Sequence, residues 1–253
     1  MRRAAALAAI WLALGAGGAQ AERLTIAVST PEVKIDSNFT GTNITVFGVI
    51  SQGATAPPGS YRVAVLVAGP AESVVVRRKE RMVGIWANRG AETIIQPPSF
   101  YDLATTGPLA SLADNAVLDR LGIGFEHIPF AYEGNAVIND PKLEEFRQAY
   151  FRLKQRQGLF NQQIGVEFIG DLIFRANVHL PANTPVGHYT AVTYLFNGGE
   201  LLAHAQDSIE VSTTGFEATM NTFAHGQALV YGIMCAALAV FIGWLGGVIF
   251  RRD

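Results

Sequence analysis

The feature that most constrains this chain is a charge-free segment near its C-terminus. No Asp, Glu, Lys or Arg occurs between Glu217 and Arg251, and residues 228–250 are nearly all apolar. As a helix with a rise of ~1.5 Å per residue, this segment is roughly 35 Å long, enough to cross a hydrocarbon core of about 30 Å. Arg251 and Arg252 follow at once, and basic residues that flank a span stay in the cytoplasm. The sequence therefore predicts one transmembrane helix over 228–250, embedded in the lipid bilayer, and a cytoplasmic tail over 251–253.

The N-terminus carries a second membrane-targeting pattern. Two arginines follow Met1, residues 4–18 are mostly apolar, and Ala19-Gln20-Ala21 has the A-x-A spacing of a cleavage site. The apolar stretch is short for a span of ~20 residues. We therefore expect residues 1–21 to be a cleaved secretory signal, with an uncleaved anchor as the alternative. Both ends together predict a bacterial inner-membrane protein whose N-terminal domain is periplasmic.

Two further features are expected beside and within the span. Thr214 and Glu217 have the spacing of a capping box, which predicts a juxtamembrane helix over 214–227. Inside the span, small residues recur at every fourth position and predict a helix-pairing face, made of Ala239, Gly243 and Gly247. The alternative is that small residues are simply common in membrane spans.

Period-2 alternation of apolar and polar residues dominates a first β portion over 22–96 and a second β portion over 161–213. Short strands separated by turn residues favour antiparallel sheets over βαβ units. Residues 97–160 interrupt the pattern as a loop and helical insertion. The sequence therefore predicts a mainly β fold, an immunoglobulin-like antiparallel sandwich with a helical insertion, followed by the transmembrane helix. One interrupted sandwich and two small ones both stay open, and we expect the two portions to pack closely.

Two helices are expected within the insertion. Asp114 is a candidate N-cap for a short helix that ends at Leu121. Asp140-Pro141 starts a longer helix, which Gly158 ends. The expected apolar stripe of this longer helix consists of Leu143, Phe146, Tyr150 and Leu153.

Composition and motifs exclude several classes of function. Only 16% of the residues are charged and the formal net charge is −2, so there is no global basic signal for nucleic acid. The single cysteine, Cys235, excludes an intrachain disulfide framework and any multi-cysteine metal site. The chain has no Walker-type loop, no dinucleotide-binding glycine motif, and no H-E-x-x-H or G-x-S-x-G pattern. We therefore expect a protein that is not an enzyme and holds no cofactor.

Three histidines fall on successive expected strands: His179, His188 and His204. If neighbouring strands aligned them, they would form a surface copper or zinc site. None of their spacings is a local metal motif. Solvated side chains on an outward face are therefore the favoured interpretation.

Two segments are candidates for an interaction surface. The densest charge run, 77–81, is expected at the tip of a hairpin, where Arg77 and Arg78 either contact an anionic headgroup or ligand or simply face solvent. The second segment is the long irregular stretch 99–132. Its aromatic residues either cover an edge of the core or form a partner surface, and they are Phe100, Tyr101, Phe125, Phe130 and Tyr132.

Several parts of the chain carry a family resemblance. Together with the signal and the single C-terminal span, residues 61–88 (YRVAVLVAGPAESVVVRRKERMVGIWAN) and 174–196 (FRANVHLPANTPVGHYTAVTYLF) resemble the alphaproteobacterial putative transmembrane protein family. Within the second stretch, residues 180–189 (LPANTPVGHY) are similar to a strand connection of bacterial immunoglobulin-like domains. The family resemblance implies an inner-membrane protein with a periplasmic domain and an association with sulfite-exporter-type permeases. It implies no activity and no catalytic residue.

These observations favour a periplasmic accessory or binding module, tethered by one helix, for another inner-membrane or periplasmic protein such as a transporter. A metal-handling or redox-enzyme subunit that uses the three histidines is one alternative. A structural envelope protein is the other.

Overall fold

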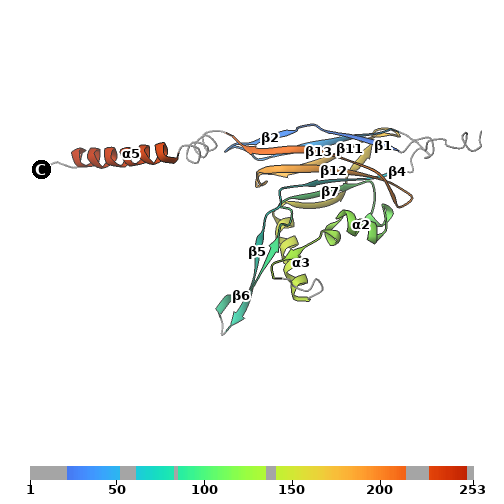
Figure 1. Ribbon diagram of the computed structural model, residues 1–253, viewed down its shortest axis with the longest axis horizontal. Helices are drawn as coiled ribbons and strands as arrows, with labels where there is room; N and C mark the ends of the chain where they lie inside the picture. The colour runs from blue at the N-terminus through green and yellow to red at the C-terminus, as the bar shows by residue number, and fades with distance from the viewer. Residues whose placement is uncertain (1–21, 52–60, 83–84, 135–140, 215–227, 250–253) are drawn as a thin grey trace, which may run out of the picture.

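The computed structural model describes residues 22–51, 61–82, 85–134, 141–214 and 228–249. Three expectations lie outside these residues: the signal over 1–21, the juxtamembrane helix beyond Thr214, and the cytoplasmic tail over 251–253. The described part is mainly β, with three sheets, one of them curled into a half-barrel, few helices and one C-terminal apolar helix (Figure 1).

Most strands belong to two large sheets. The four-stranded sheet has the order β1-β3-β11-β10 (Arg23–Val28, Gly41–Ser51, Ile173–Pro181 and Val166–Phe168). The six-stranded sheet has the order β2-β13-β12-β4-β7-β9 (Glu32–Ile35, Glu200–Thr213, Gly187–Asn197, Tyr61–Ala68, Tyr101–Thr105 and Phe160–Ile164). The third sheet, β5-β6-β8 (Val74–Met82, Ile85–Ile95 and Ala131–Tyr132), projects from the other two as a long hairpin with one short added strand (Figure 1).

Strands from the two expected β portions lie side by side in the same sheets. In the four-stranded sheet, β3 of the first portion pairs with β11 of the second. In the six-stranded sheet, β4 of the first portion pairs with β12 of the second. Because the backbone hydrogen bonds of both sheets join the two portions, residues 22–96 and 161–213 build these sheets jointly.

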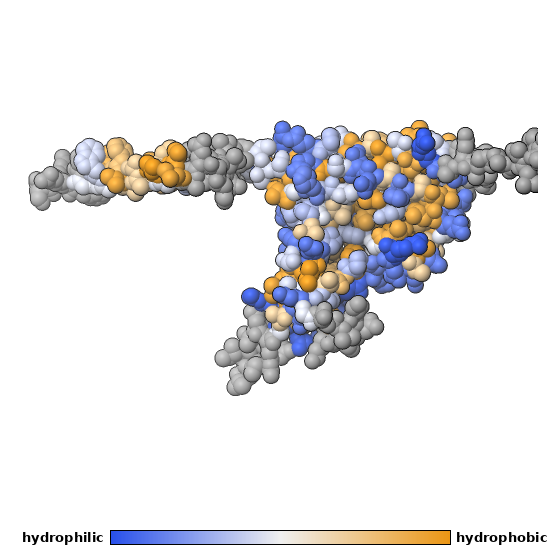
Figure 2. All heavy atoms as spheres, viewed as in Figure 1, coloured by the Kyte–Doolittle hydropathy of each residue, from blue (hydrophilic) through white to orange (hydrophobic). Residues whose placement is uncertain are grey.

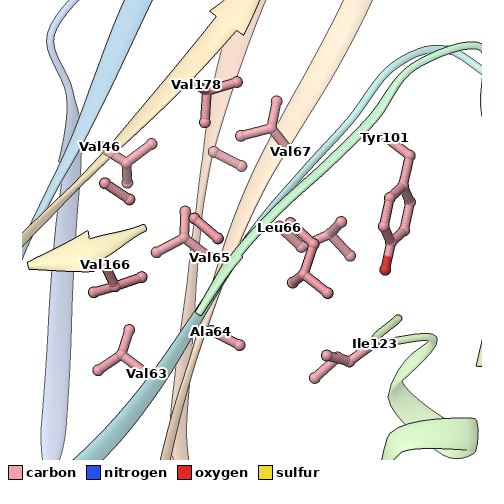
Figure 3. Packing of buried hydrophobic residues seen from close by; sticks show 14 of the residues in the cluster. Val46, Val63, Ala64, Val65, Leu66, Val67, Tyr101, Ile123, Val166 and Val178 are labelled. Carbon is pink, nitrogen blue, oxygen red and sulfur yellow. The ribbon is translucent and has the colours of Figure 1, made fainter. Parts of the chain in front are cut away.

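The two large sheets face each other across one hydrophobic core. Every second residue of β4 points toward the four-stranded sheet (Figure 3), so that Val63, Val65 and Val67 lie against Val46, Val166 and Val178. The alternate residues Ala64 and Leu66 point to the other face of β4, toward Tyr101 and Ile123 (Figure 3). Strand β4 is therefore buried on both faces, which explains its nearly continuous apolar sequence.

Strand β7 occupies part of the stretch that the sequence pattern assigned to a loop. All five of its residues are buried, because β4 and β9 flank it and both of its faces are covered. A strand buried on both faces lacks period-2 alternation, so the pattern did not reveal it. The pairing of β7 with β9 is parallel, as is that of β2 with β13. The expected antiparallel pairing is therefore wrong for these two pairs.

The short helix expected before Leu121 is present as α2 (Asn115–Leu121). It lies on the far side of β7 from the four-stranded sheet (Figure 1). Asp114 caps it, since its Oδ1 accepts a hydrogen bond from the Val117 N–H at 3.0 Å. Gly122 ends the helix in the left-handed conformation, with φ +65, which glycine adopts without steric penalty. Two short 3-10 turns lie on either side of α2, η1 (Leu109–Ser111) and η2 (Phe125–His127).

Helix α3 (Pro141–Arg156) begins at the expected proline but buries a different stripe. Leu143, Phe146 and Tyr150 are buried as expected, whereas Leu153 is 43% exposed and Lys154 only 7% exposed. At 3.6 residues per turn, position 154 lies about 20° around the helix from the buried Leu143, and position 153 lies about 20° from the buried Phe146. The helical period therefore does not separate the two residues, and the burial of Lys154 is accompanied by its hydrogen bonds to the Ser99 carbonyl and to Glu72.

Helix α5 (Ala228–Ile249) is the C-terminal apolar helix that the sequence predicted. Residues Leu229–Gly247 have a mean hydropathy of 2.1, and among the described residues this is the one helix long and apolar enough to cross a membrane. Large side chains such as Phe241 and Trp244 are more than half exposed along it. Figure 2 shows hydrophobic residues at the surface of this helix. A hydrophobic surface of this extent is stable when lipid covers it.

Candidate functional site

Helix α3 packs across one face of the β5–β6 hairpin. Arg78 of β5 lies opposite Gly90 of β6, and a Cβ added at Gly90 would lie 3.2 Å from Phe146 Cζ. The glycine therefore lets the Phe146 ring approach the hairpin closely. Arg78 Nη1 also donates a hydrogen bond to Glu145 Oε2 at 2.5 Å. The ring contact and the ion pair together hold α3 against the hairpin.

A groove of about 360 Å³ lies between α3 and β5. Its lining consists of Val76, Arg77 and Arg78 from β5 and Glu145, Phe146, Gln148, Ala149 and Arg152 from α3. Three arginines and one glutamate border the groove, a formal charge of +2 in a chain whose net charge is −2. Figure 2 shows hydrophilic residues beside hydrophobic ones where the hairpin and α3 meet. The groove is therefore suited to an anionic ligand that also carries apolar surface.

The one carboxylate neutralises little of this positive charge. The Arg78 and Glu145 side chains are 45% and 62% exposed, so water screens their attraction and the pair contributes about 1 kcal/mol or less. Within the residues that the structure describes, Arg77 and Arg152 form no ion pair. Their guanidinium groups therefore keep their capacity to bind carboxylate or phosphate oxygens.

The basic residues Arg77 and Arg78 do not lie where the sequence pattern predicted. Arg77 and Arg78 lie within β5, which continues to Met82, so the expectation of a basic hairpin tip is wrong for these residues. Consecutive side chains of a strand point to opposite faces. Arg78 therefore faces α3, whereas the Arg77 side chain leaves β5 on the opposite face and Arg77 borders the groove at the strand edge. Sequence reasoning did not single out Arg152. The available signal was its position seven residues after Glu145, on the same side of the helix.

The aromatic residues expected as a partner surface lie in or against the core. Phe100 is 0% exposed and Tyr101 2% exposed, so burial removes both from any surface. Phe125 and Phe130 are half-buried, and their rings lie 5.7 Å and 5.3 Å from the ring of Phe151 on α3. Such tilted and edge-on contacts are favourable for aromatic pairs. This cluster fixes α3 to the end of the six-stranded sheet.

Tyr132 is also half-buried, and it anchors the other end of α3. Its hydroxyl donates a hydrogen bond to the Leu143 carbonyl at 3.2 Å. The hydroxyl of Tyr101 donates to the Gly122 carbonyl at 3.0 Å and accepts from the Gly124 N–H at 2.8 Å. Burial raises the pKa of the Tyr101 phenol, so this hydroxyl stays protonated and holds the connection after α2 in place.

Lys154 fixes the C-terminal end of α3 and thereby positions Arg152. Its Nζ donates to the Ser99 carbonyl at 3.1 Å and to Glu72 Oε1 at 3.4 Å. The ammonium also lies 5.6 Å from the centre of the Tyr150 ring. A buried charge is tolerated only when it is paired and hydrogen-bonded, and these three contacts meet that requirement.

The structure does not bring the three candidate histidines together. His188 lies on β12, and His204 on β13 lies opposite Tyr194, six residues further along β12. At about 3.3 Å per residue, this separates them by roughly 20 Å. His179 lies in the other large sheet, where its Nδ1 is 2.8 Å from Asn43 Oδ1. In the part of the chain that the structure describes, no three His, Cys, Asp or Glu residues form a group able to hold a metal ion.

A buried carboxylate at Asp102 is a second group that sequence reasoning did not single out. The residue is 1% exposed; its Oδ2 accepts a hydrogen bond from Asn161 Nδ2 at 3.2 Å, and its Oδ1 is buried with no partner among the described residues. Burial raises the pKa of this carboxyl from 3.8 to about 6, and the hydrogen bond from Asn161 opposes part of the rise. The available signal was a single acidic residue within an apolar stretch.

The expected helix-pairing residues Ala239, Gly243 and Gly247 all lie on α5. Residues four apart share one side of a helix. A Cβ added at Gly243 or Gly247 would meet no other described part of the protein within 4 Å. Close approach of a second helix on this side stays a prediction.

A β-rich region followed by one membrane-length apolar helix is the architecture of a membrane-anchored protein. The chain belongs to the family described as putative transmembrane protein (Alph_Pro_TM), which matches residues 23–252. This match confirms the family that residues 61–88 and 174–196 indicated. No curated protein matches the chain.

Proposed function

We propose that this protein is a non-enzymatic, membrane-anchored binding module, and that the groove between α3 and β5 holds an acidic segment of a partner protein. The observation that supports this proposal is the charge at the groove, which three arginines and one glutamate border. The planar guanidinium group binds a carboxylate through two hydrogen bonds and stays charged at every physiological pH. The apolar part of the lining, Val76, Phe146 and Ala149, offers surface that a partner side chain can cover.

The periplasm is the proposed compartment of this groove. The signal pattern at 1–21 and the arginines after the span support an inner-membrane protein with its C-terminus in the cytoplasm. The partner is then another inner-membrane or periplasmic protein, such as a transporter. A histidine-based metal subunit is less favoured, because among the described residues the three histidines do not form one group.

The proposed scaffold of the groove is an immunoglobulin-like sandwich. In the constant-type immunoglobulin fold, strands A, B, E and D form one sheet and strands C, F and G the other. The order β1-β3-β11-β10 supports an assignment as A-B-E-D, and the order β13-β12-β4 supports G-F-C. On this assignment, β5, β6 and α3 belong to an insertion between strands C and D. The sandwich is then the rigid support, and the insertion carries the binding surface.

Site-specific crosslinking tests this function. A photo-crosslinking amino acid replaces Gln148, which lines the groove, in the full-length protein within its native membrane. We expect crosslinks to a partner segment rich in Asp and Glu. The double variant Arg77→Glu, Arg152→Glu should lose these crosslinks at least tenfold, since it reverses two of the three positive charges.

A matched control carries the same change of charge elsewhere. The double variant Arg23→Glu, Arg120→Glu places two reversals at exposed positions on β1 and α2, outside the groove. This control should retain the crosslinks. Equal loss in both double variants, or crosslinks that survive the Arg77 and Arg152 reversals, would contradict the proposal.

A further inference from the structure

Strand β5 presents an open edge beside the groove. It is the end strand of the sheet β5-β6-β8, so in the described part of the chain no strand pairs with its outer side. The groove borders three consecutive residues of this strand, Val76, Arg77 and Arg78. Consecutive side chains of a strand point to opposite faces, so these three side chains cannot all enter the groove from one face. What the three residues have in common is the edge of the strand. The groove therefore runs along backbone as well as along side chains.

The hydrogen bonds of β6 show in which direction its backbone groups point. The Glu133 N–H donates to the Thr93 carbonyl at 3.1 Å, so Thr93 directs its backbone groups toward β8. Backbone groups of neighbouring residues in a strand point to alternate sides. Glu92 and Ile94 therefore direct theirs toward β5.

The register then identifies the outward-facing residues of β5. Val74 and Val76 lie opposite Ile94 and Glu92, so they use their backbone groups in the β5–β6 ladder. Val75, the residue between them, and Arg77, the next one along, direct their N–H and C=O groups to the open edge. Val75 is 51% exposed. Two donors and two acceptors are thus available along this edge, at the spacing that an added strand requires.

Building on the function proposed above, we propose that the partner segment binds as an added β-strand on the outer edge of β5. Its backbone pairs with Val75 and Arg77, in the mode known as β-augmentation, in which backbone hydrogen bonds give affinity and alternate side chains give specificity. Carboxylates on the side of the segment facing α3 reach Arg152 and Arg78. Carboxylates on the opposite side reach Arg77. The ligand class is therefore an extended peptide with acidic residues among β-forming ones.

Peptide binding to the purified full-length protein in detergent tests this inference. The probe is a fluorescein-labelled octapeptide of alternating Glu and Thr, with fluorescence anisotropy as the readout. We expect saturable binding to the native protein. The variant Arg152→Glu should weaken it at least tenfold, whereas Arg120→Glu should leave it unchanged.

The variant Val75→Pro isolates the backbone contribution. Proline removes the outward N–H of residue 75 and leaves the hydrogen bonds to β6 in place, which edge strands tolerate. The matched control Val75→Thr keeps the N–H and the shape of the side chain. We expect at least tenfold weaker binding for Val75→Pro and near-native binding for Val75→Thr, with unchanged far-ultraviolet circular dichroism for both.

The outcomes separate strand addition from acid binding in general. Strand addition is overturned if Val75→Pro binds the peptide as the native protein does while Arg152→Glu loses binding. That result still supports an acidic partner segment. If Val75→Pro fails to fold, a peptide N-methylated at every residue gives the same test on the native protein, because it lacks backbone N–H donors. Loss of its binding supports strand addition, and retained binding overturns it. No binding of the unmodified peptide, or equal competition by phosphatidylglycerol vesicles, also overturns strand addition. The crosslinking from position 148 then decides the proposed function separately.

Discussion

Replacing Asp102 by asparagine should stabilise the protein at neutral pH. The carboxyl is 1% exposed, and burial raises its pKa from 3.8 to about 6. At 1.36 kcal/mol per pH unit, this difference corresponds to about 3 kcal/mol. At pH 7.5 the carboxylate is ionised in both states. The folded protein holds it among apolar side chains, whereas water surrounds it in the unfolded chain. The variant removes this penalty and retains an oxygen that accepts the Asn161 N–H, but buries an amide N–H without a partner at a cost of about 1 kcal/mol. The expected gain is about 2 kcal/mol.

The sign of the pH dependence follows from the two pKa values. Between pH 3.8 and about 6, the unfolded chain has released the Asp102 proton and the folded protein has retained it. The unfolded state binds fewer protons in this window, so the contribution of Asp102 to the free energy of unfolding falls as the pH rises. The full penalty is present above about pH 6. The difference between the variant and the native protein should therefore be near zero or slightly negative below pH 4, and about 2 kcal/mol in favour of the variant at pH 7.5.

Denaturant titrations at pH 3.5, 5 and 7.5 measure this difference on the full-length protein in detergent, with near-ultraviolet circular dichroism as the signal. The variant Asp171→Asn serves as a control, because Asp171 is exposed and its neutralisation should leave the pH profile unchanged. A lower stability of Asp102→Asn than of the native protein at pH 7.5 would refute the reasoning. It would mean that the ionised carboxylate has a stabilising partner in the core.

Three further substitutions test other parts of the structure. Lys154→Met should lower the free energy of unfolding by about 1–3 kcal/mol, because the buried Ser99 carbonyl loses its donor. In the same denaturant titration, the control Leu153→Met on the exposed side should change the free energy of unfolding by no more than about 0.5 kcal/mol. Gly48→Ala should destabilise by at least about 2 kcal/mol, since the added Cβ would lie 2.0 Å from Phe174 Cζ; a midpoint equal to that of the native protein would contradict this packing. Replacing the three strand histidines by alanine should leave zinc and copper binding unchanged in metal analysis, and loss of a stoichiometric metal would contradict their separation.

Local sequence signals predicted several elements correctly, because each depends on neighbours in the chain. The membrane-length helix α5 follows from a long apolar run without charge. The cap of α2 follows from an aspartate three residues before the N–H that it accepts. The clean alternation of β11 follows from one buried face and one exposed face.

Burial on both sides erases the pattern that reveals a strand, so β7 was hidden in the sequence. The same burial places Phe100 and Tyr101 in the core, although an aromatic residue in an irregular stretch is equally consistent with a binding surface. Lys154 and Leu153 show the converse case. Residue type favours burial of the leucine, but the lysine is buried instead, where its ammonium group meets the Ser99 carbonyl and Glu72.

The sequence by itself determined that the chain has an apolar helix of membrane length and a β-rich region, since these depend on local composition and period. Only the tertiary structure decided which strands share a sheet, because pairing joins residues that are up to 178 positions apart, as Glu32 and Glu210 are. It alone placed Arg77, Arg78 and Arg152 along one groove, and left the edge of β5 open beside them in the described part of the chain. A binding groove is made by two elements that meet, so neither element's sequence contains it.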